Sequence, residues 1–151
     1  MGFMDTFKKG LADAKATAAD EIAKFKNKDV LKAIVAGCTY IAYADGKIDS
    51  SEKQKMLGYL QNSPLTKVYK TDDVIALFNE NVKRFEFDFD AGRSEALRII
   101  GTQASNPTTA RMLVRTCIVI GNADGNFDDK EKKAVRDIAL ELGLNPADFD
   151  I

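Results

Sequence analysis

The 151-residue chain contains no histidine and no tryptophan, only two cysteines and three prolines, and almost no net charge. Without histidine it lacks the usual general base at neutral pH and the favoured ligand of soft metals, so a Ser-His-Asp triad and an ordinary zinc site are excluded. A net charge of −1 argues against nucleic-acid binding, which normally requires a basic surface. Any bound metal would therefore be a hard cation held by oxygen, such as Ca²⁺, Mg²⁺ or Mn²⁺.

The chain also lacks a long apolar run. The longest, residues 33–44, is too short to span a membrane, and residues 1–11 carry Asp5, Lys8 and Lys9 where a secretory signal would need an apolar core. We expect a soluble protein of the reducing cytoplasm. Cys38 and Cys117 lie in apolar stretches without CxxC spacing, which favours buried side chains over a thiol pair that reacts with an oxidising ion.

An internal repeat is the most informative feature that is present. The segment Ala-Asp-Gly-Lys-Ile-Asp-Ser-Ser-Glu-Lys at residues 44–53 returns at residues 123–132 as Ala-Asp-Gly-Asn-Phe-Asp-Asp-Lys-Glu-Lys. The same offset of 79 residues carries Cys38 onto Cys117. A helix–acidic turn–helix unit is therefore used twice, in residues 29–62 and 108–143, within one domain.

Helical spacing of apolar residues dominates the whole chain and predicts an all-α fold of about seven helices in two pseudo-equivalent halves. Asp29, Thr71 to Asp73 and Asn106-Pro107 are typical of helix starts, whereas Gly143 is typical of a helix end. Asn145-Pro146 predicts a last short turn. Phe85, Phe87 and Phe89 alternate with acidic residues, a period of two that we interpret as an extended link between helices.

Residues 1–28 are predicted to form an amphipathic helix, whose apolar residues, among them Phe3, Phe7 and Leu11, fall along one stripe. This helix is expected to face the core. Peripheral membrane contact is the alternative, because Lys8 and Lys9 flank the stripe, but nearby acidic residues dilute the positive charge that anionic lipid would require.

Each copy of the repeat brings three carboxylates into one turn. The pattern matches the second half of a calcium-binding EF-hand loop but lacks its first ligand, so it is not an EF-hand. Three carboxylates with water or backbone carbonyls can nevertheless hold a hard cation weakly, with a dissociation constant on the order of 10⁻⁴ to 10⁻³ M per turn. The candidate ligands are Asp45, Asp49, Glu52, Asp124, Asp128 and Glu131.

Helix capping explains the same residues without a metal. Asp49 with Glu52, and Asp128 with Glu131, fit a capping box, and Asp-Gly is a good turn dipeptide. Ile48 and Phe127 would then pack against the core. Cation binding and pure capping both remain open, as does a metal-free scaffold whose acidic turns contact basic segments of a partner. An enzyme is disfavoured, because the sequence offers no nucleophile–base pair and no glycine-rich phosphate loop.

At these residues the chain resembles the TerB family, small helical proteins of bacterial tellurite-resistance operons. The similarity spans nearly the whole chain. It includes the Gly-Phe-Met-Asp start, residues 25–28, Asp45-Gly46, residues 51–56, Phe85 to Asp88, residues 124–129 and residues 142–147.

The resemblance implies a cytoplasmic, non-enzymatic protein of tellurite and stress resistance. It implies action at the inner face of the membrane, beside an integral-membrane partner of the TerC type and other tellurite-resistance proteins. It also implies acidic clusters suited to metal-linked sensing, which fall on the six carboxylates named above.

Overall fold

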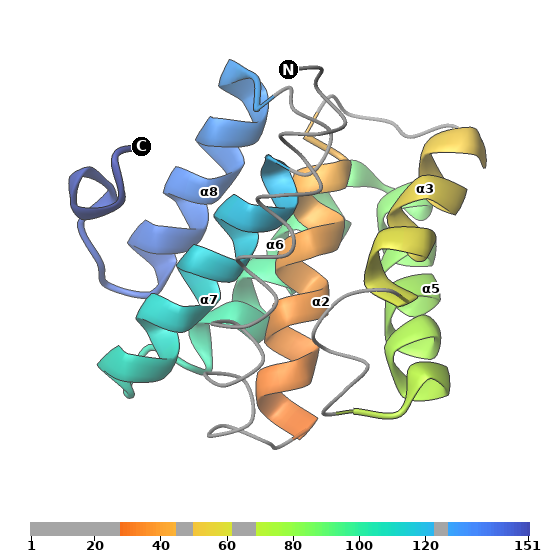
Figure 1. Ribbon diagram of the computed structural model, residues 1–151, viewed down its shortest axis with the longest axis horizontal. Coiled ribbons are helices and arrows are strands. Elements are labelled where there is room, and N and C mark those ends of the chain that lie inside the picture. The colour runs from red at the N-terminus through yellow and green to blue at the C-terminus, as the bar shows by residue number, and fades with distance from the viewer. Residues whose placement is uncertain (1–27, 45–49, 62–68, 123–126) are drawn as a thin grey trace, which may run out of the picture.

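A computed structural model describes residues 28–44, 50–61, 69–122 and 127–151. These residues form six α-helices and one short 3-10 helix and contain no strand, which confirms the all-α prediction (Figure 1). The elements are α2 (Lys28–Ala42), α3 (Ser50–Gln61), α5 (Thr71–Phe87), α6 (Phe89–Gly101), α7 (Pro107–Gly121), α8 (Asp129–Glu141) and η1 (Pro146–Phe149). The predicted N-terminal helix of residues 1–28 lies outside the described residues, except for Lys28.

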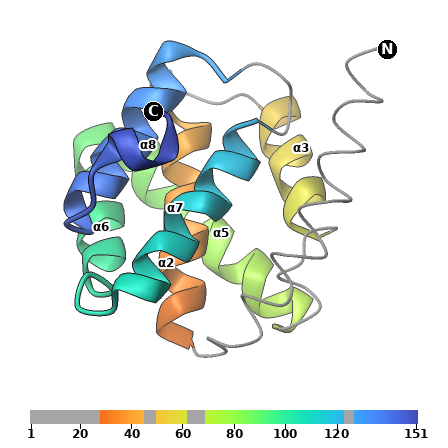
Figure 2. The ribbon, with the colours of Figure 1, turned by 60° about the vertical axis from the view of Figure 1, so that its left-hand side comes forward.

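Helix α2 is the centre of the structure. It packs against α5, α6, α7 and α8 (Figures 1 and 2), and the continuous stretch from Ala33 to Ile41 is buried. A helix that is apolar on nearly every side must be enclosed by other helices. Val30, Ile34, Cys38 and Ile41, which follow one another at intervals of three or four residues, are all buried in it.

The offset of 79 residues reappears in the helix boundaries. α2 spans residues 28–42 and α7 spans 107–121, while α3 begins at Ser50 and α8 at Asp129. The second helices of the two units nevertheless have different neighbours. α8 packs against α7, α2 and α6, whereas the main neighbour of α3 is α5. The repeat therefore sets where helices begin and end, and the surrounding helices decide where they pack.

The extended link predicted from the three alternating phenylalanines is wrong. α5 continues through Phe87 and α6 begins at Phe89, so only Asp88 is extended, with φ −163° and ψ 125°. The side chain of Asp88 accepts a hydrogen bond from the Ala91 N–H (3.0 Å) and caps α6. Burial of Phe85 between helices favours the helical conformation over a strand that would have no pairing partner.

Other predicted helix ends agree with the structure. Asn106 accepts hydrogen bonds from the N–H groups of Thr108 and Thr109, Gly143 adopts a left-handed φ of 75°, and the 3-10 turn follows Asn145. Asp29 is a correction: α2 already includes Lys28, so Asp29 lies in the first turn instead of at the cap. Its carboxylate still complements the positive end of the helix dipole there.

Cys38 and Cys117 are free thiols buried where α2 packs against α7, as predicted. A Cβ atom added to Gly37 would lie 2.8 Å from Sγ of Cys117, which shows how closely the two helices approach. Burial raises the pKa of the Cys38 thiol well above its ordinary value and that of Cys117 to about 12. These thiols are protonated, inert parts of the core.

The buried thiols predict a loss of stability at alkaline pH. An unfolded thiol titrates at about pH 8.5, so the stability linked to these groups is complete below that pH and is lost as pH rises towards the raised folded-state values. Urea unfolding at increasing pH should show this decline. A Cys38→Ala/Cys117→Ala chain should lose less of its own stability over the same interval, because alanine does not titrate. Equal pH slopes in the two chains would contradict the assignment.

Candidate acidic-turn site

The structure places the six candidate carboxylates unequally. Asp45, Asp49 and Asp124 lie outside the described residues. Glu52 belongs to the first turn of α3. Asp128 and Glu131 lie at the start of α8, where both are half-buried.

Asp128 is the N-cap of α8. Its backbone is extended (φ −76°, ψ 174°), and its Oδ1 accepts a hydrogen bond from the Glu131 N–H at 2.8 Å. This contact satisfies one of the amide groups that a helix leaves free at its start. The capping role predicted for Asp128 is therefore confirmed. One oxygen is engaged in this bond, while a carboxylate has several lone pairs with which to bind another group.

Contacts between helix ends bring both repeat units to one end of the bundle. Tyr43, just after α2, stacks on Phe85 in the last turn of α5, with ring centroids 4.9 Å apart. Lys53 in the first turn of α3 forms an ion pair with Glu86. Tyr40 near the end of α2 also donates a hydrogen bond to α8, although to Asp137 in the third turn of that helix and not at its start.

We call this region the acidic end: the last turns of α2, α5 and α7 with the first turns of α3, α6 and α8. In Figures 1 and 2 the C-terminal ends of α2 and α7 and the N-terminal end of α8 lie towards the top. The helices on either side of both acidic turns thus start or stop at the same end of the molecule.

Phe127, which follows the second acidic turn in the sequence, packs against the end of α7. A Cβ atom on Gly121 would lie 2.8 Å from Cε1 of Phe127, so the ring rests directly on the last residue of α7. The Lys132 ammonium lies 6.0 Å from the centre of the same ring. Phe127 packs against the core as predicted, whereas its counterpart Ile48 lies outside the described residues.

A polar cluster that sequence reasoning missed ties α8 to α2 and α6. The Tyr40 hydroxyl donates to Oδ2 of Asp137 (2.8 Å) and accepts from Nε of Arg93 (3.0 Å). Nη2 of Arg93 and Nζ of Lys133 lie 3.4 and 3.8 Å from the same carboxylate oxygen. Burial, reinforced by the hydrogen bond to Asp137, raises the pKa of Tyr40. The cluster fixes the orientation of α8 and so of its cap.

The two repeat units end their first helices differently. Asn122 at the end of α7 is exposed and donates to the Ile118 carbonyl (3.0 Å). Its counterpart Tyr43 is 2% exposed, and its hydroxyl is the one buried side-chain polar atom without a hydrogen-bond partner in the described part of the chain. Burial raises the pKa of Tyr43, which keeps the hydroxyl neutral.

Two absences hold for residues 28–44, 50–61, 69–122 and 127–151. No group of three or more cysteine, aspartate or glutamate side chains there is placed to hold a metal ion. Among the same residues, no helix is both long and apolar enough to cross a bilayer.

Comparison with known proteins places the sequence in a family. The family described as Tellurite resistance protein TerB matches residues 31–151. A curated relative from Alcaligenes sp, Tellurium resistance protein TerB, is 35% identical over 118 residues, which cover 78% of this chain and 97% of the relative. No solved structure matches. The matched region includes all of α3 to η1 and most of α2, with both acidic turns, and the chain therefore belongs to the TerB family of tellurite-resistance proteins.

Proposed function

We propose that this chain is a non-enzymatic helical adaptor in tellurite resistance, which binds a divalent cation through its two acidic turns and docks a membrane-protein partner. The observation that carries the proposal is the repeat: the acidic turn recurs in sequence, and the helices that flank both copies meet at one end of the bundle. Helix capping explains individual residues, but it does not require that both complete carboxylate triplets occur at the same end of the bundle.

The chemistry of the residues favours a hard cation. Every candidate ligand is a carboxylate, and the chain has no histidine. Ca²⁺, Mg²⁺ and Mn²⁺ accept such all-oxygen sites. A single turn supplies only three carboxylates, so its affinity should be weak. Two turns sharing one cation would raise the ligand count and the affinity.

A metal-free scaffold is the second candidate, favoured by the observed cap. Asp128 is already engaged with the Glu131 N–H, and a cap of this kind stabilises a helix by about 1 kcal/mol. In this alternative the carboxylates serve the fold and contact basic segments of a partner directly. Binding of the partner in the presence of a chelator would favour the scaffold.

The partner part of the proposal rests on the family. The relative's name links it to tellurium resistance, and resemblance to the TerB family implies a TerC-type integral-membrane protein together with other tellurite-resistance proteins. The adaptor would reach the inner face of the membrane through that protein, from the cytoplasm. Its net charge of −1 gives no support to a nucleic-acid partner.

Titration with Ca²⁺, Mg²⁺ and Mn²⁺ tests the cation directly. Amide signals of Gly46 and Gly125 should shift with Ca²⁺ and Mg²⁺ and broaden with paramagnetic Mn²⁺, with midpoints at or below about 10⁻³ M. Asp45→Asn with Asp124→Asn should abolish the response, because each turn then loses a charged ligand. The thermal midpoint without metal should change little.

Asp128→Ala provides the control for capping. Without metal it should cost about 1 kcal/mol of unfolding free energy, because the bond to Glu131 is lost, and with metal it should cost more, because Asp128 is also a candidate ligand. If the amide signals of Gly46 and Gly125 do not shift up to millimolar metal, cation binding is refuted. A large stability loss in the double asparagine variant, without any metal effect, would favour the caps alone.

A further inference from the structure

One large aromatic side chain at the acidic end is left in solvent. Phe87, the last residue of α5, is 88% exposed, whereas Phe85 is buried and Phe89 packs partly against the core. Exposed aromatic side chains are common anchors of protein interfaces, because they bury a large area while losing little conformational freedom. Within the described residues, the packing of α5 leaves the Phe87 ring uncovered.

The surroundings of Phe87 are negatively charged. Glu86, Asp88 and Asp90 alternate with the aromatic residues, and all three carboxylates lie on exposed residues. Glu86 is paired with Lys53, and Asp88 caps α6. Asp90 has no ion-pair partner in the described part of the chain. Lys83, one turn before Phe87, is the nearest exposed cation of α5 in the sequence.

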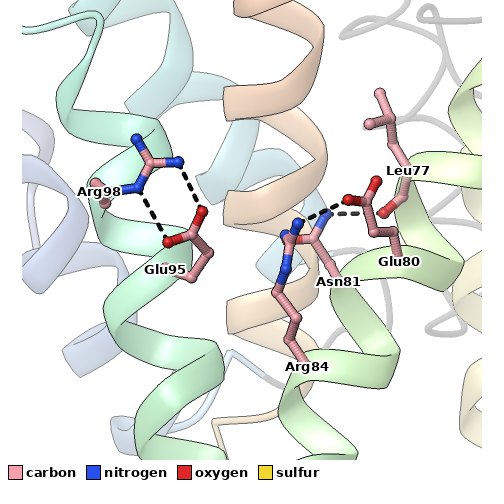
Figure 3. A network of polar contacts seen from close by, with 6 residues as sticks. All are labelled: Leu77, Glu80, Asn81, Arg84, Glu95 and Arg98. Carbon is pink, nitrogen blue, oxygen red and sulfur yellow. Dashed lines mark hydrogen bonds and ion pairs between the residues drawn. The ribbon is translucent and has the colours of Figure 1, made fainter.

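The arginines of these two helices are already engaged elsewhere. Arg84 pairs with Glu80 (2.7 Å), and Arg98 makes two bonds to Glu95 (2.6 and 3.0 Å; Figure 3). Arg93 is held by Tyr40 and Asp137. No arginine of these two helices therefore pairs with Glu86, Asp88 or Asp90. Lys53 pairs with Glu86, which leaves Asp88 and Asp90 as the negative charges beside the exposed ring, with Lys83 one turn before it.

We propose that this corner, Phe87 with Glu86, Asp88 and Asp90, is the surface on which the partner protein docks through a basic segment carrying an apolar side chain. The inference deepens the docking function proposed above and rests on it. Charge complementarity identifies the occupant, since lysine or arginine side chains can pair with the carboxylates while an apolar side chain covers the ring. A second copy that met this corner through its own corner would present like charges, and an anionic bilayer would be repelled.

Selection from a random dodecapeptide library on the 151-residue chain tests the proposal without a known partner. Binders are enriched on the unmodified chain and depleted on the empty support, and Phe87→Ser is used only afterwards, to test the selected peptides. The expected pool is rich in lysine and arginine beside aromatic or aliphatic residues. A representative peptide should shift the amide signals of residues 86–91, bind about tenfold or more weakly to Phe87→Ser, and weaken with added salt and with Asp90→Asn.

Leu140→Ser is the matched control. Leu140 is also an exposed large apolar residue (63%), but it lies in the last turn of α8, away from the acidic end. Peptide binding should be unchanged in this variant. Both serine variants should unfold at the temperature of the unmodified chain, because neither side chain is buried.

Several outcomes would overturn the proposal. They are an acidic or uncharged peptide pool, binding that survives Phe87→Ser, Phe87-dependent binding to phosphatidylserine vesicles, and Phe87-dependent self-association in sedimentation. Cation titration of Phe87→Ser tests the docking surface separately from the proposed cation binding. If the glycine signals still respond to metal while no peptide binds at residues 86–91, the docking surface is refuted and the cation-binding function stands.

Discussion

Phe78→Ala should lower the unfolding free energy by about 3–5 kcal/mol, a large part of the stability of a domain of this size. Phe78 is 2% exposed and is among the largest fully buried side chains. It lies on α5, which packs against α2, α3 and α6. Truncation removes the transfer energy of the ring and leaves a cavity that surrounding helices can fill only in part. Urea unfolding measures the loss, and the thermal midpoint should fall on the order of 10 °C.

Phe87→Ala is the matched control for Phe78→Ala. Both substitutions remove the same ring from the same helix, but Phe87 is 88% exposed. Its loss should change the unfolding free energy by no more than about 0.5 kcal/mol. Comparable losses in the two variants would contradict the core described here, as well as the exposed position of Phe87 on which the docking surface depends.

Gly92→Ala should also destabilise the protein, against the ordinary preference for alanine in helices. A Cβ atom at Gly92 would lie 2.8 Å from the backbone Cα of Phe85 and 2.7 Å from its Cγ. Because a backbone atom is involved, the strain cannot be relieved by a side-chain rotation. α5 and α6 must move apart, at a cost of about 1–3 kcal/mol or more. Urea unfolding of the variant measures this cost.

Gly58→Ala separates helix propensity from packing. Gly58 lies within α3, and a Cβ atom added there meets nothing within 4 Å. Alanine should stabilise this helix by about 0.5–1 kcal/mol. Opposite signs at the two positions are expected. If Gly92→Ala also stabilised the protein, the close approach of α5 and α6 would be wrong.

The junction of α5 and α6 shows why one sequence prediction failed. Alternation of aromatic and acidic residues from Phe85 to Asp90 is the pattern of a half-buried strand, yet the structure has two helices separated by Asp88. Only the absence of a side chain at Gly92 lets Phe85 fit between them. That contact involves two helices, and a periodic pattern along one segment carries no information about it.

The candidate site was predicted in part. The cap at Asp128 follows from the local spacing of Asp128 and Glu131, and it is present. The Tyr40 cluster was missed, because Tyr40 and Asp137 lie 97 residues apart in the chain and neither belongs to the repeated motif. The burial of Tyr43 could not be predicted from the repeat either, because the repeat aligns the buried Tyr43 with the exposed Asn122.

What the sequence determined by itself is local: an all-helical chain, most of its helix ends and a turn used twice at a fixed offset. Caps, turn residues and apolar stripes act within a few residues, so they can be recognised without knowledge of the fold. The tertiary structure alone decided that α8 packs on α7 while α3 packs on α5, and that Phe85 is buried while Phe87 is exposed. Those outcomes depend on which distant side chains compete for the same space, and close packing is a property of all the helices together.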